Sequence, residues 1–259
     1  MESFPVEIDE AIQQTAKIMR LKSRGVAFTG AGISTPSGIP DFRSPEHGLW
    51  TQYRPMEVAS LTAFRSHPDK FYSWLRPLAQ KLFSAQPNEA HHALAKLEEK
   101  ENIQTIITQN IDNLHQKAGS ENVLEVHGSL KTLSCTACHQ QTQTTEDLII
   151  SLIDEGNIPR CRECGAVLKP DVVLFEEQLP VQTWEKAETT TRNSDYMLVV
   201  GSSLTVQPVS SLPQKAVASG ATLMIINQTE THMDDQAQVL IHGDVANVLP
   251  VLTQKVLYG

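Results

Sequence analysis

Short, continuously apolar runs that alternate with helical patterns constrain the fold of this chain more than any other feature. Runs such as Tyr196–Val200 and Thr222–Ile226 have no regular polar alternation, which is typical of parallel strands buried on both faces of a sheet. We expect six strands: 26–29, 104–108, 123–126, 171–175, 196–200 and 222–226. We expect the main helices at 7–22, 61–83, 89–100, 112–118, 181–193, 207–219 and 245–257. This alternation predicts a doubly wound parallel α/β sheet.

Length and charge narrow the classes of protein to consider. A chain of 259 residues can bury the core of one large domain, or of one domain with a smaller insert. The net charge of −9 disfavours a nucleic-acid partner, because phosphate backbones are bound by basic surfaces. No run approaches the roughly 20 apolar residues of a membrane span, and the acidic start lacks the pattern of a signal peptide. We therefore expect a cytoplasmic protein with no membrane or nucleic-acid partner.

The cysteines form two matched pairs, Cys135-x2-Cys138 and Cys161-x2-Cys164, and no other cysteine is present. None is left for a disulfide framework, so the pattern indicates metal binding in a reducing compartment. Four thiolates complete a tetrahedral shell with no open position for water, which predicts a structural metal rather than a catalytic one. Reduced core cysteines are the alternative. A thioredoxin-like redox pair would leave the second pair unexplained.

A turn of small residues, Gly30-Ala31-Gly32, follows the first predicted strand directly. A strand that leads into a glycine turn commonly binds a pyrophosphate, because the backbone amides can approach the phosphates closely. Ser34 and Thr35 add hydroxyl groups, and Asp41 and Arg43 bring opposite charges to the Pro-rich segment that follows. The turn lacks the full Gly-x-Gly-x-x-Gly pattern, so purely structural glycines are the alternative.

Polar residues also follow the second and third predicted strands. Gln109-Asn110-Ile111-Asp112 comes directly after the second strand, and His127-Gly128 follows the third. Open α/β sheets bind ligands at the carboxyl ends of their strands, where these side chains could contact a ribose or a nicotinamide. His127 could act there as a general base near neutral pH. The alternatives are that Asn110 or Asp112 only caps the next helix, and that His127 is structural.

Two more predicted strands end in small or polar residues. Gly201-Ser202-Ser203 follows the fifth strand, Asn227 ends the sixth, and Gly243-Asp244 opens the last helix. Such groups could hold phosphate or ribose oxygens, and polar ends on four strands are hard to explain by packing alone. Three other histidines lie in predicted helices and are interpreted as structural: His91, His92 and His115.

In their order along the chain, several of these segments resemble the sirtuin family. They are GAGIS, PDFR, TQNID, the HG after a strand, the paired cysteine module, GSSL and the late strand that ends in asparagine. The resemblance runs from about Gly25 to the last helix, and the compact chain is most similar to bacterial members. Sirtuins are NAD-dependent protein-lysine deacylases. The resemblance therefore implies a protein deacetylase, a transferase that moves an acyl group from lysine to ADP-ribose and releases nicotinamide.

The resemblance also implies which residues bind each ligand. The expected catalytic residues are His127, as general base, and Asn110. The expected NAD-binding residues are Gly30, Ala31, Gly32, Ser34, Thr35, Asp41, Phe42, Arg43, Gln109, Asn110, Ile111, Asp112, Gly201, Ser202, Ser203, Asn227, Asp244 and Val245. The expected contacts to an acylated peptide are Val173, Leu174, Phe175, Glu176 and Val206. One structural Zn²⁺ is expected on Cys135, Cys138, Cys161 and Cys164.

In the reaction that the resemblance implies, the acyl oxygen attacks the ribose carbon as nicotinamide leaves. His127 then helps to activate a ribose hydroxyl, and water releases the free lysine and O-acyl-ADP-ribose. The segment 34–43 is expected to be a mobile loop that closes over the cofactor. The expected regions are a Rossmann-like NAD-binding domain (1–35, 84–130 and 170–259), a cofactor loop with a helical insert (36–83) and a zinc-binding module (131–169). We expect a monomer whose partner is an acylated-lysine protein or peptide.

The chain departs from the sirtuin pattern at Glu176, where the family usually has glycine. A side chain there could alter peptide pairing or acyl preference, and its carboxylate would favour basic peptides. The tyrosine and arginine that mark a preference for acidic acyl groups are not evident around Tyr72–Arg76, so we expect acetyl or other uncharged groups.

Three other functions remain open from the sequence. One is ADP-ribosyl transfer to a protein from the same NAD site, which acid and base residues alone cannot separate from deacylation. Another is a zinc-ribbon protein that binds nucleic acid, and the acidic composition counts against it. The last is a hydride-transferring oxidoreductase, which would require the intact glycine pattern and an acidic residue after the second strand.

Overall fold

The polypeptide folds into two compact units. The structure, a computed structural model, describes residues 4–42 and 48–259. Within these ranges the first unit contains residues 4–37, 86–126 and 182–259, and the second contains 38–42, 48–85 and 127–181. The predicted helical insert and the predicted cysteine module both fall in the second unit. The domain boundaries given above stay a prediction.

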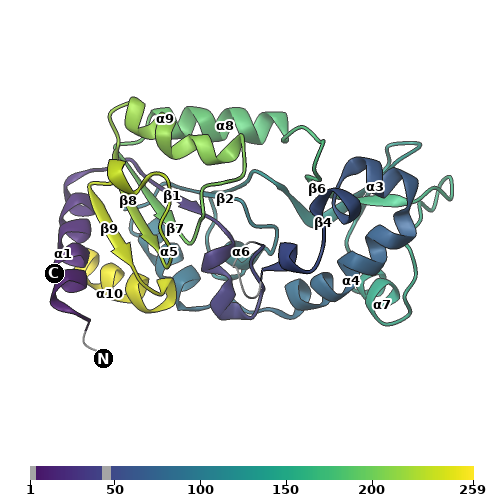
Figure 1. The fold of residues 1–259 in the computed structure, drawn as a ribbon, viewed down its shortest axis with the longest axis horizontal. Coiled ribbons are helices and arrows are strands. Elements are labelled where there is room, and N and C mark those ends of the chain that lie inside the picture. The colour runs from purple at the N-terminus through teal and green to yellow at the C-terminus, as the bar shows by residue number, and fades with distance from the viewer. Residues whose placement is uncertain (1–3, 43–47) are drawn as a thin grey trace. The chain divides into compact units, whose positions relative to one another are not determined.

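A six-stranded parallel sheet forms the centre of the first unit, in the order β3-β2-β1-β7-β8-β9 (Figure 1). Its strands are β1 (Gly25–Thr29), β2 (Thr105–Thr108), β3 (Val123–Glu125), β7 (Tyr196–Val200), β8 (Thr222–Asn227) and β9 (Val239–His242). The strand order changes direction between β1 and β7, as in doubly wound folds. The predicted fold class is confirmed.

Helices cover both faces of this sheet (Figure 1). On one face lie α1 (Val6–Leu21), α5 (Glu89–Glu99) and α10 (Val245–Tyr258), and on the other α8 (Val181–Arg192) and α9 (Leu212–Ala218). Every residue of β1 and of β7 is buried, because neither face is open to solvent. The main hydrophobic core lies between the sheet and the first group of helices, with Ile12, Leu94 and Leu252 among its fully buried residues.

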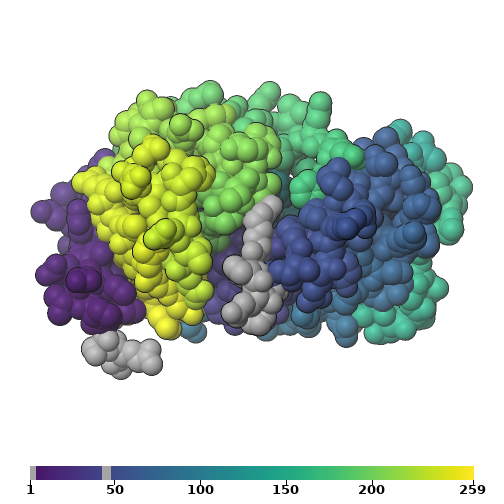
Figure 2. All heavy atoms as spheres, in the orientation of Figure 1, coloured from purple at the N-terminus to yellow at the C-terminus, as the bar shows by residue number. Residues whose placement is uncertain are grey.

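Shorter elements complete the first unit. They are α6 (Leu114–Lys117) and the 3-10 turns η1 (Ala31–Ile33), η2 (Thr35–Ser37), η4 (Val209–Ser211) and η5 (Asp234–Gln236). The first and last helices lie side by side, and Figure 2 shows them in purple and yellow on one face. Arg20 Nη1 joins their ends by donating to the carbonyl oxygens of Lys255 and Gly259, each at 2.7 Å.

Helix α5 begins where the sequence predicts, after Asn88. The Asn88 side-chain oxygen accepts from the N–H of Ala90 at 2.9 Å, and the Asn88 N–H donates to His91 Nδ1 at 3.3 Å. This reciprocal arrangement is a capping box, which satisfies backbone donors at the start of a helix.

The second unit combines helices with a three-stranded antiparallel sheet in the order β5-β4-β6. Its strands are β4 (Gly128–Cys135), β5 (Gln141–Gln143) and β6 (Leu168–Val172). Its helices are η3 (Leu49–Thr51), α2 (Pro55–Val58), α3 (Leu61–Ser66), α4 (Pro68–Ser84) and α7 (Glu146–Ile153). Helix α4 is joined to β6, the strand just before the predicted peptide-binding residues, because Tyr72 Oη donates to Leu168 O at 2.6 Å.

The prediction of a parallel strand at 171–175 is wrong. The strand covers Leu168–Val172 instead, and it pairs antiparallel with β4, so that Cys135 faces Leu168 and Gly128 faces Val172. Its burial alternates along the strand, unlike that of a strand covered on both faces. The sixth strand of the parallel sheet is Val239–His242, whose apolar run is too short to stand out in the sequence.

No helix within residues 4–42 and 48–259 is long and apolar enough to cross a membrane.

Candidate active site

The register of the parallel sheet brings three predicted site segments to one edge. Thr29 at the end of β1 pairs with Thr108 of β2 and with Val200 of β7. The segments 30–35, 109–112 and 201–203 therefore leave the sheet side by side, at the carboxyl ends where α/β sheets bind ligands. A hydrogen bond of 2.8 Å between the hydroxyls of Thr29 and Thr108 joins two of these strands at their ends.

The turns after β1 and β7 contact each other through their backbones. The N–H of Gly32 donates to Gly201 O at 2.8 Å, and a Cβ on Gly32 would lie 2.8 Å from Gly201 Cα. Gly201 has a φ of +59°, a left-handed value that L side chains rarely adopt, and a Cβ there would overlap Ile33 N. The contact thus requires glycine at position 201. The Ala31 N–H has no hydrogen-bond partner in the described part of the chain, which leaves a donor for a phosphate oxygen.

Ser34 lies buried beneath this edge, at the centre of a hydrogen-bond network. Its Oγ donates to Asp112 Oδ2 at 2.6 Å and accepts from Asn110 Nδ2 at 3.0 Å. Asn110 Nδ2 also donates to Gly30 O at 3.0 Å, which fixes the amide plane. Asp112 Oδ1 accepts from the N–H of Leu114 at 2.9 Å. Asp112 therefore binds the first amide of α6, whose N-cap is Asn113, and it also binds Ser34.

Burial dominates the chemistry of the Asp112 carboxyl group. The residue is only 6% exposed, and this removal from water raises its pKa above the ordinary value. The hydrogen bonds from Ser34 and from the N–H of Leu114 act in the opposite direction, because they stabilise the carboxylate.

Two buried histidines adjoin the same network. The ring centroids of His91 and His115 are 5.0 Å apart. His91 Nε2 approaches Ser34 Oγ at 3.5 Å, and His115 Nε2 lies 2.9 Å from Thr29 Oγ1. Burial lowers the pKa of His91 to about 4 and lowers that of His115 well below its ordinary value. Both rings are therefore neutral at neutral pH.

The second unit contains the predicted general base. His127 immediately precedes β4, and its carbonyl accepts from the N–H of Val173 at 2.7 Å. Gly128 has a φ of +75°, and a Cβ there would overlap Asp171 O, so the close approach of the two chains requires glycine. This backbone pairing holds His127 beside the start of the predicted peptide-binding segment, 173–176.

That segment runs beside the end of α2 and the start of α3 and turns at Glu176, whose φ is +74°. The N–H of Phe175 donates to Ala59 O, and the N–H of Leu61 donates to Phe175 O, each at 3.0 Å. Val173 O and the N–H of Glu176 make no hydrogen bond within the described residues. Unpaired backbone groups on an extended edge can accept a peptide by β-augmentation.

An aromatic cluster packs against this edge. Trp50 is at its centre, with ring centroids 5.2 Å from Phe42, 6.1 Å from Trp74 and 6.1 Å from Phe175. The backbone N–H of Trp50 also donates to the backbone oxygen of Phe42 at 3.0 Å. Because Phe175 is 36% exposed, the cluster offers an apolar surface to a ligand.

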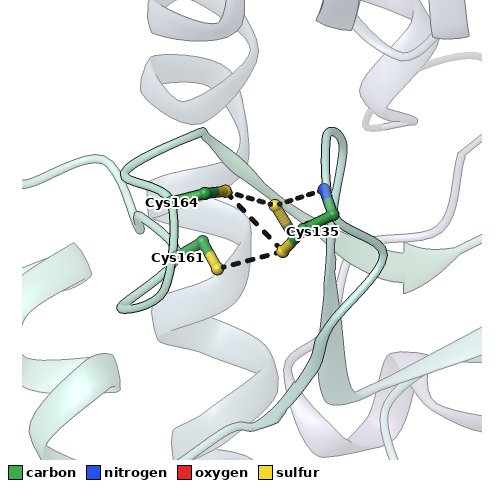
Figure 3. A group of neighbouring side chains, drawn as sticks. Cys135, Cys161 and Cys164 are labelled. Carbon is green, nitrogen blue, oxygen red and sulfur yellow. Dashed lines mark hydrogen bonds between the residues drawn. The ribbon is translucent and has the colours of Figure 1, made fainter.

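Four cysteine sulfurs converge in the second unit (Figure 3). They lie within 4.8 Å of one another, and three of the pairs are 3.4 to 3.6 Å apart. Bonds of about 2.3 Å to one tetrahedral ion place thiolates about 3.8 Å apart, so the cluster fits a metal ion. Backbone N–H groups of Cys138 and Ala137 donate to Cys135 Sγ, which lowers the pKa of that thiol and favours the thiolate.

The chain matches a known protein family along most of its length. The sequence model of the Sir2 family matches residues 30–208, more than half of the chain. The chain belongs to the Sir2 family.

Several relatives cover nearly the whole chain. The NAD-dependent protein deacylase 2 of Archaeoglobus fulgidus is 44% identical over 250 residues, which are 96% of this chain and 97% of that protein. The NAD-dependent protein deacetylase of Saccharolobus solfataricus is 43% identical over 245 residues, which are 94% and 96% of the two proteins.

Solved structures of Sir2 enzymes show the same fold. A structure from a study of the mechanism and regulation of Sir2 enzymes gives a TM-score of 0.90 at 42% identity, covering 96% of this chain and 98% of the other. A Sir2 variant solved with a deacetylated peptide and 3′-O-acetyl ADP-ribose gives a TM-score of 0.87 at 38% identity, covering 95% and 97%.

The other predicted NAD-binding residues of this Sir2 chain take different positions. Gln109 Nε2 donates to Ser202 Oγ at 2.8 Å, which links the ends of β2 and β7. Asn227 O accepts from the N–H of Gly243 at 3.2 Å, joining β8 to β9. Further members are the half-buried Thr35 and Ile111, the exposed Ser203, Asp244 as the N-cap of α10, Val245 in the hydrophobic core, and Asp41 and Phe42 in the second unit. Val206, a predicted peptide contact, is half-buried in the first unit. Arg43, and with it part of the predicted loop, lies outside the described residues.

Sequence reasoning missed the contacts of four residues. His91 and His115, interpreted from the sequence as structural, are buried and touch the hydroxyls of Ser34 and Thr29. The position of His91 three residues after a helix-capping asparagine was a usable signal. Nothing in the sequence pattern pointed to His115, or to the packing of Trp50 and Trp74 with the predicted ligand residues.

Proposed function

We propose that the protein is an NAD-dependent protein-lysine deacylase that removes acetyl groups, transfers them to ADP-ribose and releases nicotinamide. The observation that carries the proposal is the fixed polar edge around Ser34, Asn110 and Asp112 in a Sir2 chain. Relatives of this chain are named NAD-dependent protein deacylases or deacetylases. One related structure contains 3′-O-acetyl ADP-ribose, the kind of product that this reaction forms.

The buried network suits the departure of nicotinamide. As the bond between ribose and nicotinamide breaks, positive charge develops on the ribose carbon, and a fixed cation nearby would oppose it. The two imidazoles of the network, His91 and His115, are held neutral by burial. Asp112 places a carboxylate there instead. Asn110, whose amide is fixed by Gly30 O and Ser34 Oγ, is assigned to orient the ribose.

The second unit would supply the acyl-lysine. An acylated peptide would pair with the edge 173–176, where Val173 O and the Glu176 N–H are unpaired within the described residues. We assign His127 as the base that takes a proton from a ribose hydroxyl, so that this oxygen can attack the carbon of the bound acyl group. Water then completes the transfer, the bond between the acyl carbon and the lysine nitrogen breaks, and the free lysine and O-acyl-ADP-ribose leave.

The acyl group is assigned to the uncharged class. Arg76 donates from Nε to Leu152 O and from Nη2 to Gly156 O, each at 2.7 Å, so its guanidinium is engaged within the protein. Tyr72 Oη is similarly engaged by Leu168 O. These internal hydrogen bonds support an uncharged acyl group, as do the apolar contacts that the aromatic cluster around Trp50 offers.

The metal is assigned as one structural Zn²⁺ on Cys135, Cys138, Cys161 and Cys164. A closed shell of four thiolates leaves no position for a reacting water, so the metal would contribute to stability.

Metal-binding thiols, rather than disulfides, are the pattern of a reducing compartment and support a cytoplasmic location. The net charge of −9 supports a protein substrate without a nucleic-acid partner. A monomeric state and the three-region division described above complete the proposal.

The test is a mass assay with an acetyl-lysine peptide and NAD. The expected products are the unmodified peptide and O-acetyl-ADP-ribose, and neither forms without NAD. Protein that instead gains an ADP-ribose group, while the peptide keeps its acetyl group, would favour ADP-ribosyl transfer. His127→Ala should lose turnover while zinc content and melting temperature stay as in the wild type. Full turnover in that variant would remove His127 from the role of base.

A further inference from the structure

Glu176 occupies a backbone conformation that usually belongs to glycine. Its φ is +74°, in the left-handed region where a side chain crowds the backbone. The side chain is exposed, so no gain from burial offsets this strain. Glycine at this position would avoid the strain, and the glutamate must therefore make a compensating contact.

The compensating contact is with helix α3. Glu176 Oε2 accepts a hydrogen bond from the backbone N–H of Thr62 at 2.9 Å. Hydrogen bonding from Thr62, and more weakly the charge of Arg65, lowers the pKa of the Glu176 carboxyl below its ordinary value. The carboxylate is thus held by the helix and is not left free to attract a basic peptide.

The first three amides of α3 are all satisfied, and two of them by the predicted peptide-binding edge. The N–H of Leu61 donates to Phe175 O at 3.0 Å, and that of Thr62 donates to the Glu176 carboxylate. The N–H of Ala63 donates to the capping hydroxyl of Ser60 at 3.0 Å. Without the carboxylate, the edge would be joined to α3 by a single backbone hydrogen bond, from the Leu61 N–H to Phe175 O.

Glu177 holds the same edge from its other side. Its Oε2 accepts from the N–H of Leu174 at 2.9 Å and pairs with Lys169 Nζ at 2.9 Å. The pair is largely shielded, with side-chain exposures of 14% for the lysine and 21% for the glutamate. Two successive glutamates thus fasten the segment 173–175, and the groups left unpaired are the ones that a peptide can use.

We propose that Glu176 is a latch that fixes the edge 173–176 on helix α3 and so pre-forms the surface that receives the acylated peptide. It is a positioning residue that acts through Phe175, whose ring packs on Trp50 at 6.1 Å. A pre-formed edge spares the peptide the cost of ordering it, so the latch tightens peptide binding and leaves NAD binding unchanged. The identity of the peptide rests on the proposed function, whereas the latch itself does not.

Three substitutions at position 176 separate the effect of the carboxylate hydrogen bond from the effect of the backbone strain. Glu176→Ala keeps the strained backbone and removes the latch, Glu176→Gly removes both, and Glu176→Gln keeps an acceptor for Thr62. Glu57→Ala, which removes an exposed glutamate of α2, is the matched control. Exchange of the Thr62 amide hydrogen with deuterium measures directly whether the hydrogen bond to Glu176 is present. The KM for peptide, compared with the KM for NAD, measures the positioning role of Glu176.

In the alanine variant we expect Thr62 exchange and the peptide KM each to rise about tenfold, as for loss of one hydrogen bond to a charged group. The kcat and the KM for NAD should change less than about twofold, because the latch does not contact the reacting atoms. The glutamine variant should regain most of the protection, and Glu57→Ala should match the wild type.

Unchanged Thr62 exchange in the alanine variant would overturn the latch. Faster exchange with an unchanged peptide KM would overturn its positioning role. If Thr62 exchange rises as expected but the wild type removes no acetyl group with NAD, the latch stands and the deacylase assignment fails.

Discussion

Replacing the buried His91 by glutamine should remove part of the acid sensitivity of the fold. The folded protein holds the pKa of this imidazole at about 4, whereas its ordinary value is 6.5. As the pH falls below 6.5, His91 binds a proton in the unfolded chain but not in the folded chain, so the free energy of unfolding decreases. The decrease stops near pH 4, where the folded state also becomes protonated.

The size of this effect follows from the two pKa values. The gap between 6.5 and about 4 corresponds to about 3 kcal/mol when titration is complete. Linkage assigns about 2 kcal/mol of that loss to the interval from about pH 7.5 to about pH 5. The neighbouring His115, whose pKa is also lowered by burial, adds a loss of the same sign.

Glutamine is a suitable replacement because it does not titrate and still offers an acceptor to the Asn88 N–H, as in common capping boxes. The assay is urea unfolding at the two pH values, followed by tryptophan fluorescence and extrapolated to water. The wild type should lose about 2 kcal/mol more than His91→Gln between these pH values. An identical loss in both proteins would refute the claim that a neutral, buried His91 makes the fold sensitive to acid.

Two other substitutions test the metal cluster and the interlocked turns. Cys161→Ser should lose zinc, measured by atomic emission, and should melt well below the wild type, because four thiolates are needed to close the shell; a wild-type melting curve would contradict the structural role. Gly201→Ala should cost about 1–3 kcal/mol in urea unfolding, because its backbone is left-handed and a Cβ would overlap Ile33 N. It should also raise the KM for NAD, and unchanged values of both would argue against the turn as part of the NAD site.

Much of the fold could be predicted because local pattern and global position agree. The strands at Gly25–Thr29 and Tyr196–Val200 are apolar throughout, and they lie in the covered centre of the sheet. The segment 171–175 has the same apolar character, but its partner is the antiparallel strand Gly128–Cys135. Composition alone does not encode which sheet an apolar strand joins.

The candidate site could be predicted to the extent that it follows from strand ends. The register of parallel strands places Ser34, Asn110 and Asp112 together, and the structure joins them by hydrogen bonds. Contacts between side chains of different elements could not be predicted in this way. One example is the His115 ring of α6, which lies 2.9 Å from Thr29 Oγ1 of β1. The hydrogen bond from the Thr62 N–H of α3 to the Glu176 carboxylate could not be anticipated either, since the two residues lie far apart in the sequence.

The central claim is best tested by counting both products of one reaction. With an acetyl-lysine peptide and NAD, the wild type should release one nicotinamide for each acetyl group removed, and His127→Ala should lower both counts together. Deacetylation without NAD, or nicotinamide release while the peptide keeps its acetyl groups, would contradict the account.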